Sequence, residues 1–238
     1  GLMPYTYNLG DVVNAAAATI PRISEAKYVD LICNGTQQAI WDRFDWRETI
    51  APLPPFWCVP DQQDYGAPEV IVPANFSGLR KAQMFQIQQW PEIYWDLKCL
   101  RELPVNGARG ISDAISFNKS TQTFRLTRRP TGDMAAGNWM VSGDYKKLPT
   151  KVTKSNYTTF ELFSDDKYFD VWLAMMKAVA TKYVPGIPNK DSLLQEATIE
   201  LLKMASDEGF DLGETPIAPS EGLVSGYYGN AGGGPWTW

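Results

Sequence analysis

Carboxylates are the side chains with most scope for chemistry in this chain, because the sequence contains no histidine. Without imidazole there is no Ser-His or Cys-His nucleophile pair and no histidine-containing metal site. Catalysis would therefore have to rest on carboxylates, lysine or tyrosine. Glu92 and Asp96 lie in an aromatic-rich segment and could serve as the paired acids of a glycosidase, although no spacing in the sequence requires that reaction.

A second acidic group, Asp165, Asp166 and Asp170, could hold a divalent cation. The first two are explained more simply as first-turn residues of a helix, where carboxylates favour the helix dipole, and Asp170 as a solvated side chain. Residues 107–110, Gly-Ala-Arg-Gly, lack the length and the Lys-Ser/Thr of a phosphate-binding loop and indicate a turn. We therefore predict no catalytic residue, no metal and no cofactor.

The composition is that of a globular protein whose excess charge lies at one end. Of the 238 residues, 44% are hydrophobic and 13% aromatic, which argues against wholesale disorder. The chain has 27 acidic and 22 basic residues, and five of the acids lie beyond Lys203, the last base. The body is therefore neutral, without a general attraction for nucleic-acid phosphates.

No apolar run is long enough to span a bilayer, and the first residues lack the basic and apolar regions of a signal peptide. We therefore expect a soluble protein of intracellular origin with no membrane partner. Cys33, Cys58 and Cys99 are too far apart for a Cys-x-x-Cys zinc or redox site. They are expected to be reduced thiols that serve as small buried side chains.

Helical patterns occur near both ends of the chain. Ser164 is a suitable N-cap for a helix that ends in the Pro/Gly-rich run 184–189, and Ser192 is typical of a capping box that opens a second helix to Glu208. The short connection predicts an antiparallel hairpin. Two N-terminal helices are also predicted, one capped by Asn8 or Asp11 and one running from Ser24 to about Trp46.

Residues 47–156 have a strand-like period instead. The pattern predicts a short strand at Ile71 and Val72, a longer one from Leu79 to Gln88, a hairpin of Ile111–Asn118 and Thr121–Arg128 with a tight turn at Lys119-Ser120, and a strand from Asn138 to Tyr145. Residues 92–103 are ambiguous between strand and helix. Four tryptophans are expected to give this insertion a core of its own, namely Trp57, Trp90, Trp95 and Trp139.

These segments predict an α+β fold in three parts. Residues 1–46 and 157–208 form a bundle of about four helices, residues 47–156 form an inserted antiparallel β meander or sandwich, and residues 209–238 form an extended C-terminal arm. The arm holds eight of the nineteen glycines and cannot fold alone, yet it carries several aromatic residues. We predict that these residues bind a neighbouring subunit or another partner: Phe210, Tyr227, Tyr228, Trp236 and Trp238.

Two basic pairs, Arg128-Arg129 and Lys146-Lys147, are candidate contacts with DNA or with an acidic partner such as the arm of a neighbouring copy. Exposed charges in turns more often serve only solubility.

Three sequence blocks resemble the head-to-tail adaptor proteins of short-tailed phages. Residues 72–81, VPANFSGLRK, are similar to the family's Leu-Pro-x-Asp-Phe-x-x-Leu-Arg block. Residues 124–130, FRLTRRP, and 139–149, WMVSGDYKKLP, are similar to its strand, P-x-P turn and Y-x-x-x-P strand. The sequence lacks the second proline of that turn, since Thr131 follows Pro130, and the Gly/aromatic arm is not part of the shared pattern.

The resemblance implies a structural protein of the virion neck, made in the host cytoplasm. Such proteins form a ring, commonly dodecameric, that docks on the portal protein and receives the tail nozzle or tail tube, and DNA passes through the lumen without being bound. The bundle would form the ring wall, the insertion would project, and the arm would reach a portal subunit or a neighbouring adaptor. A tail terminator, tail-tube or capsid-decoration protein remains an alternative, and a strand-dominated fold without the four helices would favour it.

Overall fold

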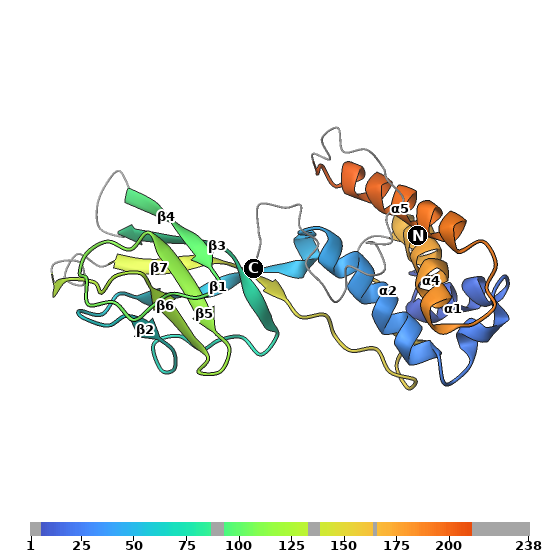
Figure 1. The fold of residues 1–238 in the computed structure, drawn as a ribbon, viewed down its shortest axis with the longest axis horizontal. Helices are drawn as coiled ribbons and strands as arrows, with labels where there is room; N and C mark the ends of the chain where they lie inside the picture. The colour runs from blue at the N-terminus through green and yellow to red at the C-terminus, as the bar shows by residue number, and fades with distance from the viewer. Residues whose placement is uncertain (1–5, 87–92, 133–138, 164–165, 211–238) are drawn as a thin grey trace, which may run out of the picture. The chain divides into compact units, whose positions relative to one another are not determined.

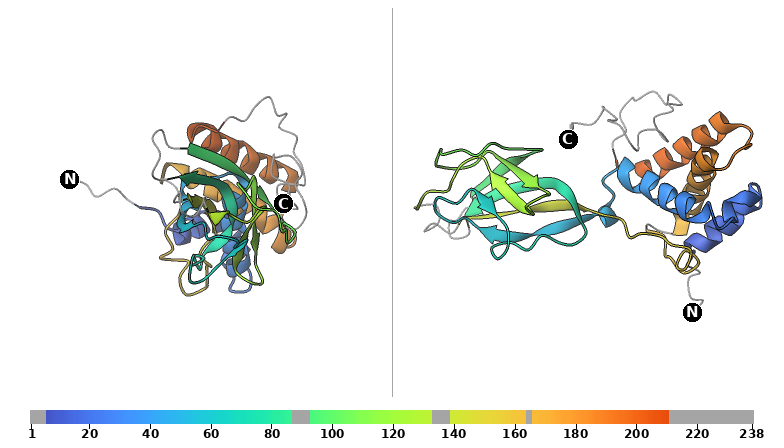
Figure 2. Two further views of the ribbon diagram at one scale, coloured as in Figure 1. Left: turned by 90° about the vertical axis from the view of Figure 1, so that its left-hand side faces the viewer. Right: turned by 60° about the horizontal axis from the view of Figure 1, so that its bottom comes forward.

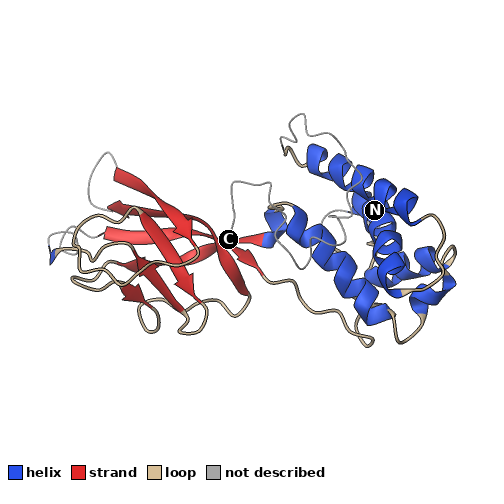
Figure 3. Ribbon diagram, in the orientation of Figure 1, coloured by secondary structure: helices blue, strands red, loops and turns tan. Residues whose placement is uncertain are grey.

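The computed structural model describes residues 6–86, 93–132, 139–163 and 166–210. Within these residues it contains four α-helices and a curled seven-stranded sheet, so the predicted α+β class is confirmed. The chain divides into two compact units (Figures 1 and 3). Of the described residues, those before Thr49 and after Leu148 form the helical unit, and those from Thr49 to Leu148 form the strand unit. Each unit has a hydrophobic core of its own.

The first helix, α1, spans Leu9–Ala17 and begins with a complete capping box. The Asn8 side chain accepts a hydrogen bond from the Asp11 amide at 3.1 Å, and the Asp11 carboxylate accepts one from the Asn8 amide at 2.9 Å. Two amides that the helix itself leaves unbonded are thereby satisfied. The predicted cap is confirmed, with Asn8 as the N-cap.

The second helix begins later than predicted. Pro21–Ser24 form a 3-10 turn, η1, and α2 spans Val29–Arg43 after Tyr28 as N-cap. Ser24 is not the cap, because its hydroxyl donates to the Pro21 carbonyl within the 3-10 turn at 3.0 Å. The helix also ends before Trp46, whose buried indole N–H donates to the Ile40 carbonyl at 2.5 Å.

The predicted C-terminal hairpin is present as α4, Phe169–Tyr183, and α5, Lys190–Asp207. Gly186 adopts a left-handed conformation with φ +81° in the connection. The prediction that Ser192 caps α5 is wrong, because the helix begins after Asn189, which has φ +57° and makes no side-chain cap. Ser164 and Asp165 lie outside the described residues, and α4 follows a 3-10 turn, η3, at Asp166–Tyr168.

Helix α4 contacts α1, α2 and α5 and carries the largest buried side chain of the hairpin, Trp172. Gly35 permits the close approach of α2, because a Cβ there would lie 2.9 Å from Val179 Cγ1. The segment after the strand unit also belongs to this core. Val152 is fully buried in it, and its amide and carbonyl bond to the Asn34 side chain at 2.9 and 2.7 Å.

The sheet of the strand unit has the order β1-β7-β3-β4-β5-β6-β2 and curls on itself (Figure 2). Its strands are β1 Ile50–Trp57, β2 Asp64–Tyr65, β3 Phe76–Gln86, β4 Ile93–Leu100, β5 Ala114–Asn118, β6 Thr123–Leu126 and β7 Trp139–Lys147. All neighbours are antiparallel except β4 and β5, which are parallel. The predicted antiparallel meander or sandwich is therefore confirmed only in part, because the chain crosses over between Leu100 and Ala114 and places β5 parallel to β4.

The strand register defines two ends of this sheet. The near end, where the chain enters β1 and leaves β7, carries Ile50, Lys147 and Phe76. The C-terminal ends of β4 and β5 also lie at the near end, because β4 runs antiparallel to β3 and parallel to β5. The far end carries Trp57, Gln86 and Trp139.

Local predictions in this unit met different outcomes. The ambiguous segment forms β4, and the predicted hairpin is present as β5 and β6. Its turn comprises residues 119–122, and the Asn118 side chain accepts a hydrogen bond from the Ser120 amide at 2.9 Å. Ile71 and Val72 do not form a strand, because only Val70 of that run is buried and the Ile71 side chain is 74% exposed.

The core of the strand unit combines aliphatic residues with a cluster of aromatic rings, most of them phenylalanine and tyrosine. Phe56 contacts Tyr65 and Phe124 at 4.9 and 5.9 Å between ring centroids, and Phe76 contacts Phe124 and Tyr145 at 5.6 and 5.3 Å. The prediction that tryptophans provide this core is correct only for Trp139 among the described residues. Trp57 and Trp95 are 49% and 36% exposed, and Trp90 lies outside the described residues.

Candidate interaction surfaces

The two basic pairs do not form one surface. Lys146 and Lys147 end β7 at the near end of the sheet, opposite Gly78 and Phe76. Arg128 and Arg129 follow β6, which is separated from β7 by β3, β4 and β5 in the order of the sheet. The two pairs therefore lie on strands that are not neighbours in the sheet.

The arginines are also engaged in local structure. Arg129 donates from Nε to the Asn106 carbonyl at 3.1 Å. The Arg128 side chain is exposed, but its amide and carbonyl both bond to the Ser112 hydroxyl, at 3.1 and 3.0 Å. These contacts tie the end of β6 to the segment that precedes β5, which is a structural role.

Residues 107–110 form an irregular loop and not the predicted turn, and Arg109 makes an isolated parallel bridge with Arg129. The Asn106 side chain accepts a hydrogen bond from the Ala108 amide at 2.9 Å, and Gly110 has φ +130°. Arg109 forms an exposed ion pair with Asp61 at 2.6 Å. The arginine is therefore directed to its own chain.

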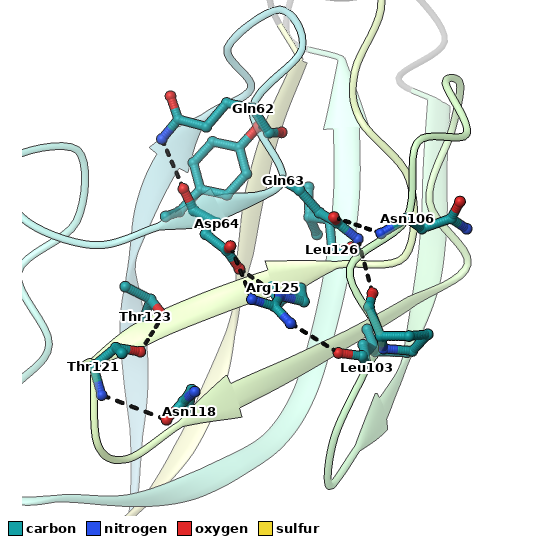
Figure 4. A network of polar contacts seen from close by, with 12 residues as sticks. Gln62, Gln63, Asp64, Leu103, Asn106, Asn118, Thr121, Thr123, Arg125 and Leu126 are labelled. Atoms are coloured by element: carbon teal, nitrogen blue, oxygen red, sulfur yellow. Dashed lines mark hydrogen bonds and ion pairs between the residues drawn. The ribbon is translucent and has the colours of Figure 1, made fainter.

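A polar network that sequence reasoning missed holds the crossover between β4 and β5 (Figure 4). The Gln63 side chain is almost fully buried and donates to the Leu126 carbonyl at 2.8 Å, while its Oε1 accepts from the Asn106 amide at 3.0 Å. Buried amides without such partners would be costly. The glutamine thereby joins the crossover loop to the end of β6.

An ion pair reinforces the same junction. Arg125 on β6 forms a bidentate pair with Asp64 on β2, at 2.6 and 3.0 Å, and its Nη1 donates to the Leu103 carbonyl at 3.1 Å. The hydrogen bond to Asp64 raises the pKa of Arg125 above its ordinary value. The polar groups of Gln63 and Arg125 in Figure 4 are directed at carbonyl, amide and carboxylate groups of the chain, so we assign the network a structural role.

The structure describes three of the five carboxylates considered for catalysis or metal binding, namely Asp96, Asp166 and Asp170. Asp96 is exposed on β4, and Glu92 lies outside the described residues. Asp170 is exposed in the first turn of α4, Asp166 begins η3, and Asp165 lies outside the described residues. In the part of the chain that the structure describes, no group of three or more Cys, Asp or Glu residues is placed to hold a metal ion.

Phe210, the first of the predicted arm residues, packs on its own helical unit. Its ring lies 5.2 Å from Phe44 and 5.4 Å from Trp46 between centroids. Its amide donates to the Ala205 carbonyl at 3.0 Å after Gly209, which has φ +82°. This hydrogen bond after a left-handed glycine is typical of a Schellman-type helix end. Phe210 is thus held in part by its own helical unit, and its predicted role in partner binding stays a prediction.

The end of α5 is held at a second point. Tyr168 donates its hydroxyl to Glu208 at 2.6 Å, and Lys167 lies 3.9 Å from the same carboxylate oxygen. Burial, together with the bond to Glu208, raises the pKa of Tyr168. The remaining arm residues, Tyr227, Tyr228, Trp236 and Trp238, lie outside the described residues.

An apolar row crosses the far end of the sheet on its outer surface. Met140 on β7 pairs with Trp57 on β1 and with Phe85 on β3, and directly paired residues share one face of a sheet. Their neighbours along β7 and β3, Val141 and Met84, point into the core instead. We call the three residues Trp57, Met140 and Phe85 the Trp57 row. It was not foreseen because its members lie up to 83 positions apart and only the register brings them together.

The sequence blocks that carry the family resemblance adjoin one another in the sheet. Residues 72–81 lead into β3, and residues 139–149 contain β7, its paired neighbour. The Tyr145 hydroxyl donates to Asn75 Oδ1 at 2.9 Å, and the Leu148 amide donates to the Asn75 carbonyl at 2.6 Å. The turn before β3 and the end of β7 are thus one structural feature.

No helix of the described chain is long and apolar enough to cross a membrane. Comparisons of the sequence with protein-family models and with curated proteins return no match.

Proposed function

We propose that this protein is a structural head-to-tail adaptor of a phage virion neck, which forms a ring on the portal and joins it to the tail. The observation that carries the proposal is the pairing of β3 with β7. It unites two of the three blocks that resemble the adaptor family, and it does so through Asn75 and Tyr145, which both belong to those blocks. Sequence blocks that pair with each other in the fold are more specific support for the resemblance than blocks that are unrelated in space.

The division of the chain supports the proposal at a second level. The helical unit is made from both ends of the chain, and the strand unit is inserted between them, which is the order of elements that the resemblance implies. In the proposed assembly the helices form a bundle in the ring wall and the strand unit projects from it. The presence of four α-helices in the described chain favours this function over a strand-dominated tail terminator, tail-tube or decoration protein.

Residues 211–238 form the partner-binding arm in this proposal, which moves its start from residue 209 to residue 211. The arm contains three acids, no base and four aromatic residues. Ordering such a segment on a partner would bury aromatic surface, which dominates the energy of many interfaces. The partners are further copies of the chain, the portal protein and the tail nozzle or tube, and DNA is cargo in the lumen.

The experiment is native mass spectrometry and negative-stain imaging of the full-length protein, alone and with portal rings. We expect ring-shaped particles bound to the portal. A chain that ends at Phe210 keeps both cores, so it should remain folded by circular dichroism but should lose portal docking. A second variant keeps the full length of the chain but changes Tyr227, Tyr228, Trp236 and Trp238 to serine. It should also fail to dock, which would assign the loss to the aromatic residues and not to the length of the arm.

Two results would contradict the proposal. A protein that remains monomeric at micromolar concentration, both alone and with portal, would contradict the proposal that the chain forms a ring. If the chain that ends at Phe210 docks with the affinity of the full-length chain, the arm does not contribute to portal binding.

A further inference from the structure

The outer face of the sheet formed by β1, β7, β3 and β4 changes character along its length. The Trp57 row lies at the far end, where the Trp57 side chain is 49% exposed, the Phe85 side chain is half-buried and the Met140 side chain is only 8% exposed. The next row towards the near end is polar and contains Ser142, Gln83 and Asp96. An exposed tryptophan beside a half-buried phenylalanine, bordered by polar residues, is a feature of interaction surfaces.

Lysines follow nearer the point at which the chain enters the sheet. Lys81 lies on the same outer face, paired with Asp144, and Lys98 lies beside Lys81 because Ala82 pairs with Leu97. Lys146 follows two positions after Asp144 on β7. With Asp96, this face carries three lysines and two aspartates, so it is basic at the near end and aromatic at the far end.

The C-terminal segment has the matching order of groups. Its three acids, Asp211, Glu214 and Glu221, come first, and its four aromatic residues all lie between residues 227 and 238. The segment begins at a fixed point, since Phe210 is held on the helical unit by Phe44 and Trp46. Twenty-eight residues reach about 90 Å when extended, at about 3.3 Å per residue, which is far enough to cross to another subunit.

We infer that residues 211–238 of one copy dock on this outer face of a neighbouring copy, with the acids towards Lys81 and Lys98 and the terminal aromatics on the Trp57 row. The inference deepens the proposed function and rests on it, because it requires the ring. Each copy then donates one arm and accepts one, a head-to-tail contact that closes into a ring. Aromatic side chains stacked on Trp57 supply the buried surface, and the lysines set the direction of the arm.

The test uses full-length protein in which Trp236 is replaced by the photo-crosslinking residue p-benzoylphenylalanine. These unlabelled copies are assembled in equal amounts with ¹⁵N-labelled copies that lack the crosslinker, and native mass spectrometry records the ring. After irradiation, we expect about half of the crosslinked peptides to join an unlabelled arm to a ¹⁵N-labelled peptide that contains Trp57, Phe85 or Met140. Trp57→Ser should lower that yield about tenfold, as removal of a central aromatic anchor does.

Ile71→Ser is the matched control, because Ile71 is the more exposed apolar residue and precedes β3 at the near end of the sheet. It should leave the crosslink yield unchanged, and both variants should keep the wild-type melting temperature. Crosslinks confined to unlabelled peptides, or crosslinks to peptides of the helical unit, would overturn the inference. If the ring is intact in that experiment, the proposed function is not contradicted. The absence of any assembly would overturn both.

Discussion

The phenyl ring of Phe210 packs edge-on against the indole of Trp46, with ring centroids 5.4 Å apart and ring planes at 82°. Trp46 is fully buried and lies four residues before β1, so this contact ties the last described turn of the chain to the residues that lead into the strand unit. The root of the C-terminal segment is therefore fixed, whatever the segment itself binds.

Phe210→Ala should destabilise the helical unit by about 1–2 kcal/mol. The half-buried ring loses its contacts with Phe44 and Trp46, and a fully buried phenylalanine would cost about 3–5 kcal/mol. Urea denaturation followed by far-ultraviolet circular dichroism measures the difference. Trp57→Ala, an exposed aromatic of the other unit, is the control and should leave the helical transition unchanged. A Phe210→Ala protein as stable as the wild type would show that the ring contact contributes nothing.

Gly143→Ala should prevent stable folding of the strand unit. Gly143 lies on the inner face of β7 between Leu53 and Ala82, and a Cβ at this position would lie 2.1 Å from the Lys81 carbonyl oxygen. The obstacle is backbone, which cannot move aside as a side chain can, so we expect a loss of about 3 kcal/mol or more. The near-ultraviolet circular dichroism of the buried aromatics reports the outcome.

The control for this glycine is Gly107→Ala, since a Cβ on Gly107 meets no atom within 4 Å. That variant should have the wild-type spectrum and melting temperature. Equal stability of the two alanine variants would mean that β3 and β7 are not as close as the structure places them.

Local sequence signals predicted the elements whose formation depends on near neighbours. The capping box at Asn8, the hairpin of β5 and β6, and the helices α4 and α5 all follow from residues within a few positions of one another. The predicted starts of two helices were wrong. The Ser24 hydroxyl bonds within a 3-10 turn, and Ser192 lies inside the first turn of α5.

The features that long-range contacts decide were not predictable. The crossover that precedes the parallel strand β5 is held by contacts to Gln63 and Arg125, and these two residues are 62 positions apart. The Trp57 row likewise exists only because β1 and β3 flank β7. The tryptophans were assigned to the core because they are large and apolar, but cross-strand register placed Trp57 outside and phenylalanines inside.

Gln63→Leu should destabilise the strand unit by about 1–3 kcal/mol. The leucine fits a similar volume but leaves the Asn106 amide and the Leu126 carbonyl without the side-chain partner that each now has. Hydrogen exchange offers the most specific measurement, because the Asn106 amide should lose protection while the amides of β1 and β7 keep theirs. Unchanged protection of Asn106 would show that this hydrogen bond does not hold the loop.

Gln63→Glu provides an isosteric contrast. One carboxylate oxygen can still accept from Asn106, but the other would face the Leu126 carbonyl, so the buried side chain favours its protonated form and its folded-state pKa should rise. The variant should therefore approach wild-type stability at low pH and lose stability as the pH rises through that raised pKa. Stability that increases with pH relative to the wild type would contradict the assigned geometry.

The buried cysteines allow the two units to be followed separately. Burial raises the pKa of Cys33 in the helical core and of Cys58 in the strand core to about 12 in each case. At pH 8 neither thiol should react with iodoacetamide until its own unit opens, because the thiolate is the reactive form. Cys99, which is only half buried, should react first. Mass spectrometry of tryptic peptides gives the three rates in one experiment.

A core substitution in one unit should therefore expose one thiol and leave the other protected. Trp172→Ala removes a fully buried side chain of the helical core, at a cost of about 3–5 kcal/mol, and should speed the modification of Cys33 by about 100-fold or more. Phe124→Ala should do the same to Cys58 through the strand core. Because no buried residue is shared between the two cores, the rate of the second thiol should change less than about twofold in each variant. Parallel acceleration of Cys33 and Cys58 by either substitution would show that the units unfold as one.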